Sequence, residues 1–517
     1  MKATTFLLHL TATALCCLLP LSATHAQDEP DNWMTNGRPE NLSLPGTLAA
    51  NNGAHRIGSR QTAPLTCTGS PRVPLVLVQF ADKKFQTPND NEADIVAYYD
   101  TFCNGEDEAA GKNQYSIRDY FKQQSGGLFT PQFSVLGPVT LPKEAAYYGQ
   151  NSGSSKDIHF NEFCNEAVKL VQESDVNWMD FDNDGNGSVD MVFFIFAGLG
   201  ENSSHQADDI WAKEAVRNTT INGITYACYG CTSELRPLTR DQEGNITATE
   251  GDGIGVACHE LSHALGLPDL YNTGSGSSVP GMDLFSLMDY GSYCQNGFRP
   301  VAYTAYERDF MGWLPLVELD SPQKVTLLPI ANGGKGYKVT NPANPDEYYI
   351  LENRQSVNAD ATLGRLAHGL LVTHVDYSSS AWSSNTLNNN AAHQRMTFIS
   401  AANDPTTVGN AGSFQEWTRA LAGHLYPGTS LNYNLTDEST PAATVFTGGL
   451  MHQPIRDITE HSDGTVTLSF CIDEGDGVTA PQAGGKQGTH AYDPAGRRVS
   501  PTSKGLYIIN GKKLIVR

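Results

Sequence analysis

The sequence has few positive charges. Its 517 residues include 34 Lys and Arg against 56 Asp and Glu, which gives a net charge of −22 at pH 7. So acidic a chain has no electrostatic attraction to phosphate backbones or anionic lipids, and we expect no binding to nucleic acid. The hydrophobic content of 39% is ordinary for folded proteins and excludes a chain that is disordered throughout.

Long hydrophobic runs are also missing, except at the N-terminus. Residues 1–26 carry a basic residue, Lys2, near their start, continue with an apolar stretch from Phe6 to Leu21, and end in small residues at Ala26. This is the pattern of a signal peptide, and it predicts a secreted, extracellular protein. The apolar stretch is interrupted by Pro20 and is too short for a stable membrane span. No other stretch approaches that length, so we expect no transmembrane segment.

Cysteine is sparse, with 10 in the whole chain. Two of them lie in the signal peptide, and the even number that remains favours some disulfides in an oxidising compartment. The sequence does not choose among the pairings. Cys228 and Cys231, in "CYGC", would fit a zinc knuckle or a redox motif, but there is no second such pair. A disulfide or two buried thiols is therefore the favoured interpretation.

Composition divides the mature chain into four parts. Residues 27–70 are polar, rich in Asn, Pro and Gly, and are predicted to be a leader or propeptide. Residues 71–316 contain buried strands, such as "RVPLVLVQFAD", and helices, and are predicted to be one folded domain, which also contains the motif described next. Residues 317–473 contain short strands separated by turn residues, which favours an all-β, sandwich-like domain. Residues 474–517 are predicted to be a linker and a C-terminal tail.

The stretch "VACHELSHALGLPDLYNT" carries the strongest functional signal. In a helix, His259 and His263 lie one turn apart on one face, within reach of a single metal ion. Glu260 is one step round the helix, where it can meet a metal-bound water without ligating the metal. Zinc lowers the pKa of such a water toward about 7, and the carboxylate takes the proton before attack on a carbonyl. The motif predicts zinc-dependent hydrolysis with Glu260 as general base.

The residues after this helix predict the third ligand. Gly266 permits the positive φ that ends a helix, and Pro268 cannot extend one normally. Together they turn the chain back, so that Asp269 approaches the ion held by His259 and His263. A carboxylate is a good zinc ligand, although the best-known extended motif has a histidine at this position. The alternative is a surface helix with two solvent-facing histidines.

The segment "FSLMDYGSY" follows about twenty residues later and resembles the methionine turn of metzincin proteases. Met288 would pack under the metal, and Tyr290 would support the metal site or the oxyanion. The alternative for Met288 is an ordinary core residue, since a methionine in an apolar stretch usually fills space.

The acidic segment "DFDNDGNGSVD" predicts a calcium site. It matches the first nine positions of an EF-hand loop, with hard oxygen ligands at alternate positions. These ligands are Asp182, Asp184, Asn186, the Ser188 carbonyl and Asp190. Phe193 stands where the bidentate glutamate of an EF-hand would be, so calcium would need further ligands or water. The alternative is a solvated acidic turn.

Together these residues resemble the immune inhibitor A-like secreted bacterial zinc metallopeptidases, a metzincin-related family with the pattern H-E-x-x-H-x-x-G-x-x-D. The likeness extends to "VPLVLVQFAD", "DDIWAKE", "YERDFMGWL" and "EYYILENRQ", and covers roughly residues 72 to 470. It implies zinc on His259, His263 and Asp269, Glu260 as general base, and protein or peptide substrates. It implies an α+β fold, in which a zincin-like catalytic domain, a twisted sheet beside the active-site helix, is followed by the all-β domain.

Two further points qualify this resemblance. The residues after Met288 are Asp289 and Tyr290, whereas the family usually has a small residue after that methionine. The tail "YDPAGRRV…KGLYIINGKK" resembles C-terminal segments of exported proteins in Bacteroidota-like bacteria, which implies export or cell-surface attachment. The alternative function is a catalytically inert adhesion or glycan-binding protein on a peptidase scaffold. The intact Glu260 argues against it, because an inert scaffold does not need a general base.

Overall fold

The computed structural model describes residues 63–153, 155–174, 176–274 and 281–472, together with four short strands between residues 491 and 516. The predicted signal peptide, most of the predicted leader and most of the C-terminal tail lie outside the described residues.

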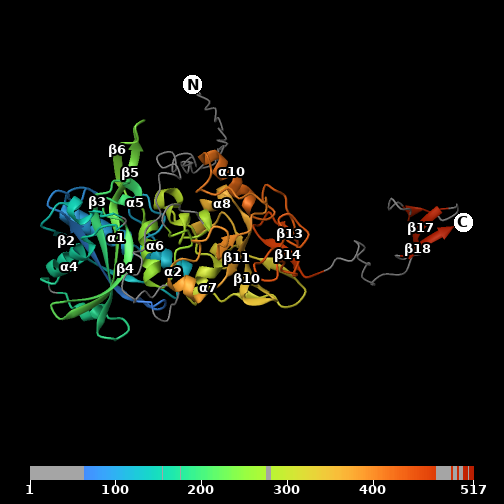
Figure 1. The fold of residues 1–517 in the computed structure, drawn as a ribbon, viewed down its shortest axis with the longest axis horizontal. Helices are drawn as coiled ribbons and strands as arrows, with labels where there is room; N and C mark the ends of the chain where they lie inside the picture. Colours follow the sequence, from blue (N-terminus) through green and yellow to red (C-terminus); the bar gives the residue numbers. More distant parts are fainter. Residues whose placement is uncertain are drawn as a thin grey trace, which may run out of the picture.

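The first half of the described chain builds a six-stranded mixed sheet with helices on both faces (Figure 1). Its elements are β1 (Arg72–Gln79), α1 (Glu92–Asn104), α2 (Ile117–Gln124), β2 (Gln132–Thr140), α3 (Ala145–Tyr148), α4 (Phe160–Val171), the 3-10 helix η3 (Trp178–Phe181), β3 (Ser188–Leu199), α5 (Glu201–Ser204), β4 (Lys213–Ile221), β5 (Ile224–Arg240), β6 (Ile246–Gly251) and α6 (Ile254–Ala264). The strand order is β2-β1-β3-β5-β4, and β6 pairs with β5. The pairs β2/β1, β1/β3 and β3/β5 are parallel, whereas β4 and β6 run antiparallel to β5.

Alternating side chains of the central strands face two separate hydrophobic cores. Leu75 and Leu77 of β1 belong to the cluster that contains residues of α1, α2 and α6. Val76 and Val78 of the same strand belong to the cluster that contains residues of α3 and α4. A sheet buried on both faces needs apolar residues at every position, which explains the uninterrupted apolar run in β1.

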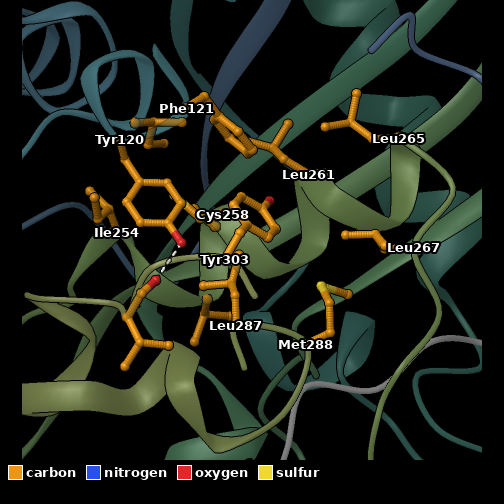
Figure 2. Packing of buried hydrophobic residues seen from close by; sticks show 14 of the residues in the cluster. Tyr120, Phe121, Ile254, Cys258, Leu261, Leu265, Leu267, Leu287, Met288 and Tyr303 are labelled. Atoms are coloured by element: carbon orange, nitrogen blue, oxygen red, sulfur yellow. Dashed lines mark hydrogen bonds between the residues drawn. The ribbon is translucent and has the colours of Figure 1, made fainter. Parts of the chain in front are cut away.

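Helix α6 is packed into the first of these cores along one face. Ile254, Cys258, Leu261 and Leu265 recur at intervals of three and four residues, as expected for one side of a helix. Figure 2 shows this row beside Tyr120 and Phe121 of α2. The Tyr120 hydroxyl donates a hydrogen bond to the carbonyl oxygen of Val301 over 2.7 Å.

The second half of the described chain combines two further sheets with short helices. Its elements are η4 (Asp283–Phe285), η5 (Tyr290–Gly297), α7 (Ala305–Phe310), β7 (Val317–Glu318), β8 (Gln323–Leu327), η6 (Ile330–Asn332), β9 (Tyr337–Asn341), β10 (Asn344–Arg354), η7 (Asn358–Asp360), α8 (Leu363–Leu366), β11 (Gly369–Asp376), α9 (Ser379–Ser383), β12 (Met396–Phe398), α10 (Phe414–His424), β13 (Ile455–Glu460) and β14 (Val466–Phe470). One sheet has the order β12-β11-β10-β9-β7 and the other has the order β13-β14-β8. We call residues 317–472 the second module.

The hydrophobic core does not stop at the start of the second module. Ile350, Trp382 and Trp417 of that module lie in the same buried cluster as Cys258 and Met288. Each Å² of apolar area buried contributes roughly 25 cal/mol to the free energy of folding. Packing of these large side chains therefore stabilises the second module and the first half of the chain together. The whole described fold is therefore mixed α/β, with several sheets.

The C-terminal strands form a sheet of their own. β15 (Ala491–Tyr492), β16 (Arg498–Val499), β17 (Gly505–Ile509) and β18 (Lys512–Val516) pair in the order β16-β15-β17-β18, and all three pairs are antiparallel. Among the described residues, no helix is long and apolar enough to cross a bilayer.

The expectation of disulfides is wrong for the described residues. Among the described residues, none of the eight cysteines after the signal peptide forms a disulfide, and seven of them are buried. Cys228 and Cys231 lie on β5 as buried thiols. Burial raises the pKa of Cys228 well above its usual value, so this thiol stays protonated and acts as a small core residue.

Candidate metal centre

Helix α6 carries the first two predicted ligands and the predicted base. It spans Ile254–Ala264, and the chain turns at Gly266, whose φ is +100°, as the sequence predicted. Two glycines let the helix approach η5: a Cβ on Gly253 would lie 2.2 Å from the carbonyl carbon of Gly297, and one on Gly255 would lie 1.9 Å from the carbonyl oxygen of Ser292. This close approach brings the segment after Met288 against α6.

The three predicted ligands converge on one point. His259 Nε2 lies 3.1 Å from Asp269 Oδ1, His263 Nε2 lies 3.2 Å from the same oxygen, and the two Nε2 atoms are 3.2 Å apart. Ligands of a tetrahedral zinc ion with bonds near 2.0–2.1 Å are separated by about 3.3 Å. The side chains of all three residues are at most 1% exposed. The structure therefore groups them in the spacing that one zinc ion requires.

The hydrogen bonds of the imidazole rings indicate that a cation belongs between them. His259 Nδ1 donates to the carbonyl oxygen of Leu287 over 2.9 Å, and His263 Nδ1 donates to that of Leu267 over 2.8 Å. Since a carbonyl oxygen only accepts, the proton of each neutral ring is on Nδ1 and each Nε2 carries a lone pair. Two such lone pairs and a carboxylate oxygen that face each other at about 3.2 Å are stabilised by positive charge among them, which a proton or a metal ion can supply. The donor set fits zinc.

The local electrostatic potential also favours positive charge. Burial opposes charge on His263, but Asp269 and Glu260 outweigh it and raise the pKa of this imidazole to about 9. Burial alone would raise the pKa of Asp269, but the two histidines hold it far below the usual value of an aspartate. The carboxylate is therefore ionised and ready to bind a cation.

Glu260 lies beside this group without joining it. The residue is 0% exposed, and none of the described residues donates a hydrogen bond to either of its carboxylate oxygens. Burial raises the pKa of Glu260 well above the usual value, so the carboxyl has a strong affinity for a proton. An orphaned buried carboxyl is costly for stability and is typical of a catalytic group.

The predicted methionine turn contacts the segments that carry His259 and Asp269. Met288 is 0% exposed, and the residue before it, Leu287, supplies the carbonyl that holds His259. The Met288 carbonyl accepts a hydrogen bond of 2.9 Å from the backbone N–H of Leu270, the residue after the third ligand. The turn thus fixes two of the three ligand segments.

Asp289 stands where the family usually has a small residue, and its carboxylate holds the surrounding loop by hydrogen bonds. Its Oδ2 accepts hydrogen bonds from the backbone N–H groups of Gly281, Met282 and Asp283, at 3.0, 2.9 and 3.1 Å. Its Oδ1 accepts from the N–H of Tyr290 at 2.9 Å. One carboxylate therefore organises the loop on both sides of the turn, which a small residue could not do.

Two tyrosines near the site differ in their contacts. Tyr290, singled out by its sequence position, starts η5 and its ring lies 6.2 Å from that of Tyr293. Tyr271, which the sequence did not single out, hydrogen-bonds through its hydroxyl to Asp269. Its ring also stacks with that of His259 at 6.5 Å. The only available signal for Tyr271 was its position two residues after the third ligand.

Asn385 of the second module also contacts the third ligand, and no motif pointed to it. Its Nδ2 donates to Asp269 Oδ2 over 2.6 Å, and its Oδ1 accepts from the backbone N–H of Asp269 over 2.8 Å. The two residues are 116 positions apart, so only the folded structure brings them together.

The acidic loop brings three of its predicted ligands together at a second place. Carboxylate oxygens of Asp182, Asp184 and Asp190 lie within 4.8 Å of one another. The backbone N–H of Asn186 donates to Asp182 Oδ1 and Asp184 Oδ1, each at 3.0 Å, and its side-chain Oδ1 accepts from the N–H of Ser188 at 2.9 Å. These bonds fold the loop around its own carboxylates.

Asp190 distinguishes this loop from a plain solvated turn. It is 2% exposed, and its Oδ1 has no hydrogen-bond partner among the described residues. Burial raises the pKa of Asp190 to about 6. Phe193, at the twelfth position of the motif, is 0% exposed within β3 and supplies no ligand atom. The loop offers a partial oxygen cage that a cation would complete with water.

Comparison with known proteins finds a metallopeptidase family that matches the part of the chain containing this site. Residues 68–313 match the catalytic domain of the immune inhibitor A peptidases, family M6. This segment belongs to the immune inhibitor A-like metallopeptidases. The matched range includes the six-stranded sheet, α6, the three converging residues His259, His263 and Asp269, and the predicted methionine turn.

Individual relatives show the same likeness over part of their length. The chain is 28% identical over 225 residues to the pre-pro-metalloprotease PrtV of Vibrio cholerae, an alignment that covers 39% of this chain and 24% of that protein. It is 24% identical over 289 residues to immune inhibitor A of Bacillus thuringiensis, which covers 48% of this chain and 41% of that protein. The chain thus spans less than half the length of each relative.

Proposed function

We propose that this metallopeptidase is a secreted, zinc-dependent endopeptidase whose zinc ion is held by His259, His263 and Asp269. The convergence of His259 Nε2, His263 Nε2 and Asp269 Oδ1 to within 3.2 Å of one another carries the proposal. The orientation of both Nδ1 atoms toward backbone carbonyls supports it, since neutral imidazole with a free Nε2 is the form that binds zinc.

Zinc in such a site would polarise the carbonyl of a peptide substrate and lower the pKa of a water molecule toward about 7. Glu260 then acts as general base. Its raised proton affinity lets it accept the proton from the attacking water, and burial keeps competing solvent away from its oxygens. The protonated Glu260 can return that proton to the leaving amine. A peptide amine needs such a proton, because it is a poor leaving group when unprotonated.

We also propose a role for each of three segments of the chain. We propose that residues 71–316 form a zincin-type catalytic domain, because a mixed sheet with an antiparallel outer strand, β4, lies beside the active-site helix. The β-rich residues 317–473 are proposed as a sandwich-like partner domain. The tail at residues 474–517 is proposed as a sorting or surface-attachment segment, on the strength of its sequence pattern.

We also propose calcium at the acidic loop. The three grouped carboxylates, supplemented by Asn186 and the carbonyl of Ser188, are the hard oxygen donors that calcium prefers. The buried, unpartnered Oδ1 of Asp190 supports a cation there, because an unpaired buried oxygen costs stability unless something binds it.

The proposed activity can be tested on wild-type protein with an unfolded protein as substrate. We expect cleavage at internal peptide bonds, loss of cleavage after dialysis against a zinc chelator, and recovery when about one equivalent of zinc is returned. Mass spectrometry of the fragments identifies internal cleavage. Calcium added alone after chelation should not restore cleavage, since the two sites differ in donor atoms.

The opposite result would favour the alternative function. If the protein binds zinc at one ion per chain but cleaves no unfolded substrate, the scaffold is inert and the adhesion or glycan-binding alternative gains support. If cleavage continues at an unchanged rate without any bound metal, the zinc mechanism is wrong.

A further inference from the structure

The three proposed zinc ligands are oriented by different parts of the chain. The carbonyls of Leu287 and Leu267 hold the two histidines, and both lie within the segment that matches the family's catalytic domain. The side chain of Asn385 holds Asp269, and it lies 72 residues beyond that segment's end at residue 313. The third ligand therefore depends on a residue outside the catalytic domain proper.

Two hydrogen bonds join Asn385 and Asp269. The amide Nδ2 donates to Oδ2 of the carboxylate over 2.6 Å, and the amide Oδ1 accepts from the backbone N–H of the same aspartate over 2.8 Å. The first bond fixes the rotation of the carboxylate and the second fixes the backbone from which it projects. The other oxygen, Oδ1, is then left facing the two histidine Nε2 atoms at 3.1 and 3.2 Å.

Asn385 is itself held firmly. It is 9% exposed, and its φ of +53° is a left-handed conformation that asparagine adopts more readily than most residues. Its backbone N–H donates to the carbonyl of Trp382 over 3.1 Å, and its carbonyl accepts from the hydroxyl of Thr273 over 2.5 Å. Trp382 is 0% exposed, so this contact ties Asn385 to the core of the second module.

Neighbouring asparagines extend the same contact along the chain. Asn388 Nδ2 donates to the carbonyl of Leu270 over 2.7 Å, and Asn389 Oδ1 accepts from the backbone N–H of Thr273 over 2.8 Å. The segment after Asp269 is thus bound to the second module at several successive residues, which limits its freedom to move away from the helix.

We propose that Asn385 is the positioning residue for the third zinc ligand, so that the second module completes the metal site of the catalytic domain. The inference rests on the proposed zinc site. An amide is suited to this role because it donates to the carboxylate without adding charge, whereas a lysine or arginine would neutralise the ligand. The bond to Oδ2 also favours ligation through Oδ1 alone. Orienting partners of this kind typically contribute 10–100-fold in metal affinity.

The most direct test compares two substitutions at Asn385. Asn385→Asp is nearly isosteric and tolerates the same φ, but it cannot donate to Asp269 and adds a negative charge beside it. Asn385→Gly accepts the φ without strain and removes the side chain altogether. We expect the zinc dissociation constant, measured by competition with a chromophoric chelator, to rise about 10–100-fold in both variants. Peptidase activity lost at limiting zinc should return at excess zinc.

A matched control lies elsewhere in the same module. Asn341 on β9 is 1% exposed, and its Nδ2 donates to the carboxylate of Glu347 over 3.0 Å. Asn341→Asp therefore makes the same chemical change at a buried amide–carboxylate pair that does not involve a zinc ligand. We expect it to lower the melting temperature of the metal-free protein without changing the zinc dissociation constant by more than about threefold. A loss of zinc affinity that merely follows loss of stability would appear in this control as well.

Wild-type protein provides a second measurement that needs no variant. Because binding and ordering are reciprocally linked, removal of zinc should speed amide hydrogen exchange in peptides that contain residues 381–390. Peptides from β13 and β14 should keep their rates. Unchanged zinc affinity in both Asn385 variants, or unchanged exchange at residues 381–390, would overturn the proposal for Asn385. Failure of the wild-type protein to bind zinc at all would instead contradict the proposed function.

Discussion

The two candidate metal centres of this chain make an informative comparison. In each of them, three side chains place ligand atoms within 4.8 Å of one another. The acidic loop collects its carboxylates from nine consecutive residues, 182–190, and folds them largely by hydrogen bonds within the loop. The buried centre collects its ligands from eleven residues, 259–269, but their orientation comes from Leu287 and Asn385, far along the chain.

The difference concerns what sets the affinity of each centre. The cation affinity of the acidic loop depends mainly on residues within the loop, because its own hydrogen bonds place the carboxylates. Water can complete the coordination shell of the cation. A buried centre admits little water, so its ligands must already point to the correct place when the ion arrives. The comparison therefore predicts large effects from disturbing the buried centre and smaller, separable effects from disturbing the acidic loop.

The largest effect is expected from His263→Ala. This change removes one of the three proposed ligands and one of the two imidazoles that lie close to the Asp269 carboxylate, at 3.1 and 3.2 Å. Zinc content after dialysis should fall from about one ion per chain to below about 0.1, because a catalytic zinc site needs three protein ligands. Activity should fall at least about 10³-fold, since a catalytic metal supplies several kcal/mol to the transition state. Elemental analysis and a peptidase assay measure the two quantities.

The same variant also tests whether the centres are independent. Thermal stabilisation by calcium should be the same in His263→Ala as in the wild-type protein. A loss of the calcium effect in this variant would mean that the two centres are coupled, and the comparison would fail.

A smaller effect is expected from Asp190→Asn in the acidic loop. Calcium at about 100 times its dissociation constant should stabilise the wild-type protein by about 2.7 kcal/mol, a rise of roughly 3 °C in the melting temperature of a fold of this size. Most of this rise should disappear in Asp190→Asn, while zinc content and activity at low temperature stay the same. Differential scanning calorimetry with calcium and with a calcium chelator measures the rise.

Asp180→Asn is the control for the loop. Asp180 is a nearby carboxylate, but it forms an exposed ion pair with Arg72 at 2.8 Å instead of joining the grouped oxygens. Exposed pairs contribute about 0–1 kcal/mol, so this variant should keep the calcium effect. If calcium shifts the melting temperature of Asp190→Asn as much as that of the wild type, or shifts neither, the acidic loop is a solvated turn.

The sequence predicted the local features well because they follow from short-range rules. Ser116 caps α2 in the manner common for a serine before a helix, since its side chain accepts from the N–H of Asp119. The apolar run that starts at Arg72 is a buried strand, and the turn at Gly266 has the positive φ that the motif requires. Each of these depends on neighbours within a few residues, so a single sequence contains the information.

Features that depend on distant partners could not be predicted. Nothing in the pattern "SNTLNNN" indicates that Asn385 bonds to Asp269, because the contact exists only after two modules pack together. Nor does the even number of cysteines reveal that the described cysteines form no disulfide. Cys228, for example, donates a hydrogen bond to the carboxyl of Glu214 over 2.7 Å. The role of Asp289 as acceptor for successive backbone N–H groups likewise depends on the loop at residues 281–283.

The most direct test of the central claim is Glu260→Ala, assayed for turnover and for zinc in the same preparation. Glu260 contacts no proposed ligand through a hydrogen bond among the described residues, so its removal should leave about one zinc ion per chain. Turnover should fall at least about 10²-fold and up to about 10⁴-fold, the usual contribution of a general base. Full activity in this variant, or loss of the zinc ion together with activity, would contradict the assignment of Glu260 as a base that acts beside the metal without binding it.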